Sequence, residues 1–211
     1  MEAFEEKKYD VLVIGAGAAG MRAAIAASDE GASVCLVSKS LLGKAHTVMA
    51  EGGAAAALGN ADEGDNWKVH FRDTIKGGKH LNNWKMAKIH AEQAPKRILE
   101  LEKWGAVFDR TKDGKINQRN FGGHRYPRLA HVGDRTGLEI IRTEQDKVIH
   151  QENIDIFMEC TVAKIITESN QAVGALAYYR NNGDIVAIHA KAIIVAKLAL
   201  VLESKCLLIK S

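Results

Sequence analysis

The feature that most constrains this chain is a glycine-rich turn, GAGAAG at Gly15–Gly20, which separates two segments of different character. Residues 9–14 (YDVLVI) precede it and are apolar and β-branched, which predicts a strand buried in a parallel sheet. Residues 18–28 follow it and are rich in alanine, which favours a helix. A second apolar run, SVCLV at residues 33–37, predicts another buried strand. Residues 9–38 therefore predict one βαβ unit.

A G-x-G-x-x-G turn between a strand and a helix is typical of a dinucleotide cradle, and its three glycines have separate tasks. Gly15 permits the tight turn, Gly17 lets backbone N–H groups approach a pyrophosphate, and Gly20 lets the helix lie close to the strand. The positive end of the helix dipole favours the same phosphates. NAD and FAD both remain open, because both use such a cradle. The predicted contacts are Gly15, Ala16, Gly17, Ala18, Ala19 and Gly20.

The second predicted strand does not end in the acidic residue that commonly binds a ribose, because Ser38 and Lys39 stand there. A serine hydroxyl still hydrogen-bonds a ribose, although less strongly than a carboxylate. Residues 39–60 then lose all periodicity and are rich in glycine and alanine. Such a stretch in a compact protein predicts a long functional loop with short helical turns.

The remaining periodicity predicts a mixed order of helices and strands. It indicates mainly helix over residues 66–104, irregular surface structure over 105–135, and a helix from Thr136 toward His150. A β-rich section should follow, with a start at 154–163, antiparallel strands at 172–179 and 185–190 around a tight turn, and one more buried strand at 192–196.

Composition excludes several classes of function. The net charge of +3 comes from 29 basic and 26 acidic residues in mixed order, so no nucleic-acid partner is expected. The three cysteines, Cys35, Cys160 and Cys206, are far apart, which fits a reducing compartment and structural roles. Neither they nor the histidines show the spacing of a metal site, so no metal is predicted. No secretory signal or membrane-spanning segment is expected.

Three strings in this order carry a resemblance to a known family: SKSLLGKAHTVMAEGG, DNWKVHFRDTIKGGKHLN and QRNFGGHRYPRLAHVGDRTG. Over about residues 8–196 the chain resembles the flavoprotein subunit of succinate dehydrogenase and fumarate reductase. The resemblance implies an α/β fold: a Rossmann-like FAD-binding domain with a central parallel sheet and an inserted antiparallel β meander, truncated. This domain is expected over residues 1–196, with an atypical tail at 197–211 and without the family's capping and C-terminal helical domains.

The resemblance also assigns the residues of the site. In this family a histidine in the position of His46 carries FAD covalently, and such a bond fixes the ring and makes the flavin a stronger oxidant. The other residues implied to contact FAD are Ser38, Lys39, Ser40, Thr47, Ala50, Glu51, Gly52 and Gly53. Phe121 and Gly122 match the family's dicarboxylate site, although Phe121 could equally be a core residue. Asp134 and Arg135 are expected to form an ion pair or helix cap, and no residue is assigned a catalytic role.

The activity that the resemblance implies is the interconversion of succinate and fumarate by hydride transfer with FAD. Electrons would pass to an iron-sulfur subunit, within the electron transport of the respiratory chain and the tricarboxylic acid cycle. Membrane-anchor subunits would hold the complex, so the chain is expected in the cytoplasm, peripherally attached to the inner face of the cell membrane. Two alternatives stay open: another FAD enzyme such as L-aspartate oxidase, whose members lack this histidine, or a non-catalytic remnant that retains nucleotide binding.

The resemblance ends abruptly after the last predicted strand. The family continues with A-T-G-G, whereas this chain reads Ala196-Lys197-Leu198-Ala199 and then LVLESKCLLIKS. A frameshift or premature stop is the hypothesis that explains such a change. The family's proton-donating arginine and the histidine and arginine that hold substrate carboxylates come later in its sequence, so the 211-residue chain alone is not expected to be active.

Overall fold

The computed structural model describes residues 5–196 and 208–210. The chain divides into two compact units. The first consists of residues 1–47 and 144–211, and the second of residues 48–143. The second unit is thus inserted into the sequence of the first.

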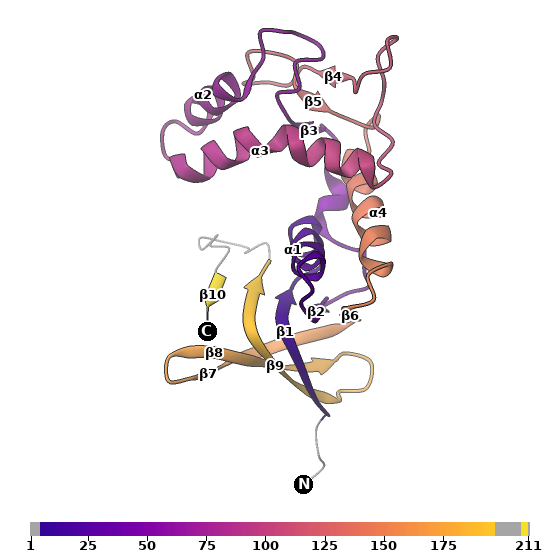
Figure 1. Ribbon diagram of the computed structural model, residues 1–211, viewed down its shortest axis with the longest axis vertical. Helices are drawn as coiled ribbons and strands as arrows, with labels where there is room; N and C mark the ends of the chain where they lie inside the picture. The colour runs from indigo at the N-terminus through magenta and orange to yellow at the C-terminus, as the bar shows by residue number, and fades with distance from the viewer. Residues whose placement is uncertain (1–4, 197–207, 211) are drawn as a thin grey trace. The chain divides into compact units, whose positions relative to one another are not determined.

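The first unit is built on a seven-stranded sheet with the order β6-β2-β1-β9-β8-β7, and β10 also pairs with β9 (Figure 1). Its central part is parallel, because β1 pairs in parallel with β2 and β9, and β2 with β6. The parallel strands are β1 (Glu5–Ile14), β2 (Val34–Val37), β6 (Ile154–Phe157) and β9 (Ile185–Val195). Helix α1 (Ala18–Asp29) connects β1 to β2, which confirms the predicted βαβ unit.

An antiparallel meander continues this sheet beyond β9. Strand β7 (Cys160–Glu168) pairs with β8 (Gln171–Tyr179), and β8 pairs with β9. A short strand, β10 (Leu208–Lys210), pairs with the C-terminal half of β9. One prediction is wrong here: the expected strands at 185–190 and 192–196 are a single strand, β9. Lys191, which interrupts the apolar pattern between them, lies exposed and pairs with Asp10 at 2.6 Å.

The core of the first unit is formed by the apolar runs that predicted it. Leu12, Cys35 and Ile193 are fully buried between strands, and Met21 and Ile25 are buried on α1. The structure confirms that Cys35 and Cys160 are buried, and both are free thiols. Cys206 lies outside the described residues. Burial raises the pKa of both thiols, that of Cys160 to about 11.

The second unit contains two helices and a small antiparallel sheet with the order β3-β5-β4. The helices α2 and α3 begin after Asn66 and Asn83, whose side chains accept hydrogen bonds from the first-turn N–H groups. The elements are α2 (Trp67–Gly77), α3 (Trp84–Lys103), β3 (Ala54–Ala55), β4 (Gln118–Arg119) and β5 (Leu129–Ala130). The predicted helical segment is confirmed, with a break at 78–83, and α3 continues through Pro95.

Two elements cross the boundary of the units in sequence: the short 3-10 helix η1 (His46–Met49) and α4 (Thr136–Ile149). Helix α4 confirms the helix predicted from Thr136. The prediction of irregular surface structure for 105–135 is only partly right, because Arg128, Leu129 and Ala130 are buried.

The observed architecture confirms the expected α/β fold with a parallel-dominated sheet and an antiparallel addition. The predicted tail at 197–211 lies outside the described residues, apart from the backbone of β10. Within the part of the chain that the structure describes, no helix is long and apolar enough to cross a membrane.

Candidate functional site

The loop between β1 and α1 has the backbone geometry of a tight glycine turn. Gly15 has a φ of +109°, which lies in the left-handed region, and its N–H donates to the carbonyl of Val37 at 2.8 Å. A Cβ atom on Gly20 would lie 1.7 Å from the carbonyl oxygen of Gly15. The packing of α1 against the turn therefore requires glycine at position 20.

Gly17 differs from its two neighbours because the protein itself does not require glycine there. Its backbone is extended, with φ −82° and ψ −179°, a conformation open to any residue. A Cβ atom would meet only Ala45 and Thr47, at ordinary distances of 3.6 and 3.7 Å. Gly17 is the N-cap of α1 and offers no side chain to cap it, and no acidic residue lies in the first turn. The start of α1 is thus suited to an external anion.

The residues that follow β2 are held mainly by their backbones. Ser38 is buried, its N–H donates to Phe157 at 2.8 Å, and its carbonyl accepts from Cys160 at 2.9 Å. Lys39 is exposed. The Ser40 hydroxyl donates to the carbonyl of Lys44 at 3.0 Å, so it stabilises its own turn.

His46 begins the 3-10 helix η1 and is exposed, so its ring is accessible for the covalent bond that the resemblance implies. Thr47, the next residue, is half-buried. Its Oγ1 lies 3.5 Å from the N–H of Ala18, the first residue of α1. The first unit therefore brings the predicted loop residue Thr47 to the predicted glycine cradle.

In the second unit, the predicted loop residues Ala50, Glu51 and Gly52 have their carbonyl groups fixed by hydrogen bonds. The carbonyl of Ala50 accepts from the N–H of Gly137 at 2.7 Å. Those of Glu51 and Gly52 accept from Nη2 and Nε of Arg119, both at 2.8 Å. The sequence interpretation did not single out Arg119, although it lies in one of the quoted strings.

Gly53 and Phe121 complete this loop region. Gly53 has a φ of +120°, and a Cβ there would lie 2.8 Å from the carbonyl oxygen of Ala130. Phe121 is 59% exposed, so it is not the core residue that was its alternative interpretation. Its ring lies over Gly52, where a Cβ would approach Cε2 to 3.4 Å. Gly122, the next residue, is exposed.

Asp134 was expected to form an ion pair or helix cap with Arg135. It forms an ion pair, but with Arg119, whose Nη1 lies 3.1 Å from its carboxylate. Arg119 therefore contacts Glu51, Gly52 and Asp134 together.

A buried ionic cluster that the sequence did not indicate lies elsewhere in the second unit. Nη2 of Arg128, a fully buried residue, contacts Asp65 at 2.8 Å and Asp73 at 3.0 Å. The ring of His70 lies 5.2 Å from that of His90 and 5.9 Å from that of His124, measured between centroids. Burial, with the charge of Arg128 as the next cause, lowers the pKa of His70 to about 4. The described residues hold no cluster of three or more His, Cys, Asp or Glu arranged for a metal ion.

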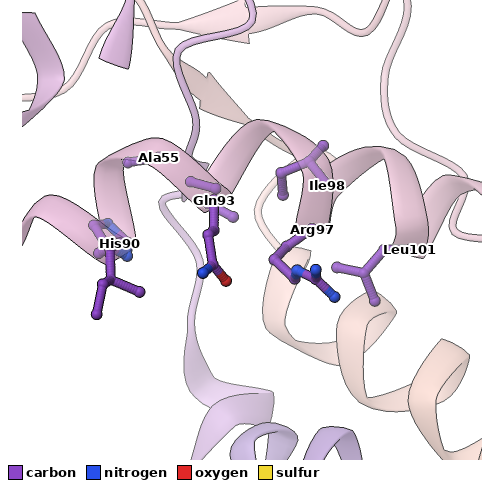
Figure 2. Close-up of a pocket in the computed structure, with 9 residues that line it drawn as sticks. Ala55, His90, Gln93, Arg97, Ile98 and Leu101 are labelled. Carbon is purple, nitrogen blue, oxygen red and sulfur yellow. The ribbon is translucent and has the colours of Figure 1, made fainter. Parts of the chain in front are cut away.

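A cavity of about 380 Å³ runs along α3 beside β3 in the second unit. Figure 2 shows Gln93, Arg97 and Leu101 on the same side of α3, and Ala55 of β3 also lines the cavity. None of the residues predicted to bind FAD or substrate lines it, so it is not the site derived above.

Comparisons with known proteins agree with this geometry. The sequence model of the FAD binding domain family matches residues 10–201. An uncharacterized FAD-dependent oxidoreductase of Methanocaldococcus jannaschii is 44% identical, over 90% of this chain and 34% of its own length. The CoM/CoB fumarate reductase of Methanothermobacter marburgensis contains a chain that is 40% identical, over 89% and 34%. The Sdh1 complex of Mycobacterium smegmatis contains a chain that is 55% identical, with a TM-score of 0.89, over 91% and 34%.

The glycine cradle, the parallel sheet and the family match together define an FAD-binding domain of the α/β type, and the chain belongs to that family. Its homologues are succinate dehydrogenase and fumarate reductase flavoprotein subunits, whose N-terminal parts it matches. The chain spans about a third of the length of these relatives. The resemblance that the sequence strings indicated is thereby confirmed.

Proposed function

We propose that this chain is the part of a succinate dehydrogenase or fumarate reductase flavoprotein that holds FAD, bound covalently through His46. The dicarboxylate pair succinate and fumarate is the proposed substrate class, and an iron-sulfur subunit is the proposed electron partner. The complex would attach to the inner face of the cell membrane through its anchor subunits. The proposal rests on the homologues and on one local observation, the unexplained glycine at position 17.

Gly17 carries the argument because its neighbours in the turn have other reasons to be glycine. Gly15 is required by its positive φ and Gly20 by the close carbonyl, whereas neither backbone nor packing restricts Gly17. A group outside the protein, approaching the N–H groups at the start of α1, explains this residue. A pyrophosphate is such a group, and FAD contains one.

The proposed roles of the remaining residues follow from their positions. Gly15 to Gly20 would hold the pyrophosphate, and Ser38 to Ser40 follow β2, where a ribose is bound in this type of fold. His46 and Thr47 and the loop Ala50–Gly53 are assigned to the flavin ring, and Phe121 and Gly122 to the dicarboxylate beside it. When bound, the flavin supplies hydride transfer to or from a substrate carbon.

The experiment is to express the 211-residue chain with ample riboflavin, denature it, and record flavin fluorescence at its mass on an acidified gel. Fluorescence is expected for the wild type and for His150→Ala, which removes an exposed histidine outside the proposed site. His46→Ala should lose the signal in the gel. The same samples are analysed for FAD released on denaturation and, by circular dichroism, for folding.

The outcomes separate the three functions. A covalent signal that depends on His46 is the expected result. FAD that is bound by the wild type but fully released on denaturation would contradict the covalent bond and favour another FAD enzyme. A well-folded wild type without any flavin would contradict the proposal and leave a remnant without cofactor.

A further inference from the structure

The loop Ala50–Gly53 is held by an unusual set of hydrogen bonds. Three consecutive carbonyl groups, those of Ala50, Glu51 and Gly52, all accept bonds from the second unit itself. Two of them accept from one guanidinium, that of Arg119. In an extended segment successive carbonyls point in opposite directions, so convergence of two neighbours on one group indicates a curved backbone.

The curvature determines where the donors of this loop point. Each peptide is planar and trans, so its N–H is directed away from its C=O. When the carbonyls of Glu51 and Gly52 converge on Arg119, the N–H groups of Gly52 and Gly53 are directed to the opposite side. Successive N–H groups on one side of a curved backbone form a concavity that favours electron-rich atoms.

Arg119 itself is held in place by an ion pair. Its Nη1 binds Asp134 at 3.1 Å, so each of its three nitrogens has an acceptor. The side chain of Asp134 is 84% exposed, whereas that of Arg119 is 33% exposed. A planar, always charged fork with three fixed acceptors has little freedom to rotate.

We propose that Arg119, oriented by Asp134, is a positioning residue that shapes the loop so that its N–H groups meet an electron-rich edge of the flavin ring. This inference rests on the proposed function, because it takes the flavin as the ligand of the loop. Donors at such an edge stabilise the charge that the flavin gains on reduction. Loss of the clamp should therefore lower both FAD affinity and the reduction potential of bound flavin.

The test compares Arg119→Gln, Arg119→Lys and Asp134→Asn with the control Arg110→Gln, which removes an arginine of the same unit that pairs with Glu102. The first measurement needs no flavin: a protease specific for glutamate cleaves after Glu51, and cleavage after Glu168 in the exposed turn before Gln171 serves as the internal reference. Loss of two charged hydrogen bonds should raise the relative rate at Glu51 by roughly tenfold or more in Arg119→Gln.

The second measurement is the visible spectrum and reduction potential of the flavin in each folded variant. Arg119→Gln should show a more negative potential than wild type and the control, and Arg119→Lys, which keeps the charge but not the fork, should lie between them. Asp134→Asn should shift the potential in the same direction by less.

Each result supports or overturns the proposal. Unchanged cleavage at Glu51 in Arg119→Gln overturns the clamp, whether or not flavin binds. Faster cleavage with an unchanged potential shows a loop support without influence on the flavin and also overturns the proposal. If the wild type binds no flavin, the proposed function fails and the assigned ligand falls with it, while the protease result still reports on the loop.

Discussion

Two glycines of the turn between β1 and α1 are needed for different physical reasons. At Gly20 the reason is internal, because a Cβ would lie 1.7 Å from the carbonyl oxygen of Gly15. At Gly17 the surrounding atoms leave room for a methyl group. One motif therefore contains a residue that serves the fold and a residue that serves the proposed ligand.

This difference predicts opposite behaviour for two otherwise identical substitutions. Gly20→Ala should lower the free energy of unfolding by about 3 kcal/mol, because an overpacked carbonyl cannot move without shifting α1. Gly17→Ala should leave that free energy nearly unchanged yet weaken FAD binding at least roughly tenfold, because its methyl group stands where the phosphates approach.

The measurements are urea unfolding without FAD and fluorescence titration with FAD for both variants. Ala23→Gly, in the middle of α1, serves as a control for the helix, because it costs about 1 kcal/mol of propensity and touches neither the turn nor the ligand. Equal FAD affinity in Gly17→Ala and wild type would show that the cradle is not used for a pyrophosphate.

At the scale of elements, a buried ionic cluster joins the helices of the second unit to its small sheet. Arg128 immediately precedes β5, and its guanidinium reaches Asp65 before α2 and Asp73 within α2. Its carbonyl accepts from the N–H of Ala56 at 2.9 Å, next to β3. Since β3 follows the loop that ends at Gly53, the cluster supports the backbone of that loop.

The cluster also predicts a dependence of stability on pH. The pKa of His70 is about 4 in the folded chain, below its ordinary value of 6.5, first because of burial and then because of Arg128, His90 and His124. The unfolded chain therefore binds the proton more readily between these values. Stability should be full above pH 6.5 and fall by up to about 3 kcal/mol as the pH drops toward 4.

The check is the free energy of unfolding between about pH 7.5 and 4.5 for wild type and His70→Asn. The variant should lose much of the slope, and His150→Asn, which changes an exposed histidine, should retain it. Part of the slope will remain, because the pKa of His124 is lowered as well by burial and Arg128. The same slope in wild type and His70→Asn would contradict this role of His70.

At the scale of the whole molecule, the chain leaves the first unit after residue 47 and returns at residue 144. Strands β2 and β6 are parallel neighbours in the sheet, although the complete second unit separates them in sequence. Each unit has its own apolar core, which centres on Leu12 and Ile193 in the first and on Phe108 and Ile98 in the second.

The buried thiols of the first unit report on its integrity. Cys35 and Cys160 are almost fully buried and burial raises the pKa of both, so neither should react with a thiol reagent in the folded chain. In a Cys206→Ser background, these two thiols should become reactive only as urea unfolds the first unit. Fast reaction of either thiol under native conditions would contradict the packing of this sheet.

The sequence predicts the first unit well because its signals are local. An apolar run, a glycine turn and an alanine-rich helix specify the βαβ unit, and Asn182-Gly183 specifies the β8–β9 turn. The continuity of β9 was missed because Lys191 interrupts the apolar pattern, although its side chain reaches solvent and pairs there with Asp10. Charge alone does not end a strand.

The site was harder to predict where it depends on distant residues. The cradle and the loop Ala50–Gly53 are visible in the sequence, the first by its spacing and the second by resemblance. Arg119 and Arg128 are not, because an arginine in a glycine-rich segment is normally a surface residue. Only the folded chain shows that one fixes the carbonyls of a loop and the other is fully buried beside two aspartates.

Strand β9 has a practical consequence for anyone who wishes to modify this protein. Along its length β9 is paired to β1, while β8 occupies the other side of its first half and β10 of its second. Deleting one residue inside it would reverse inward and outward side chains in everything that follows. The tip at Asn182 and Gly183 lies beyond all these pairings, so an affinity tag or a fluorescent label belongs there.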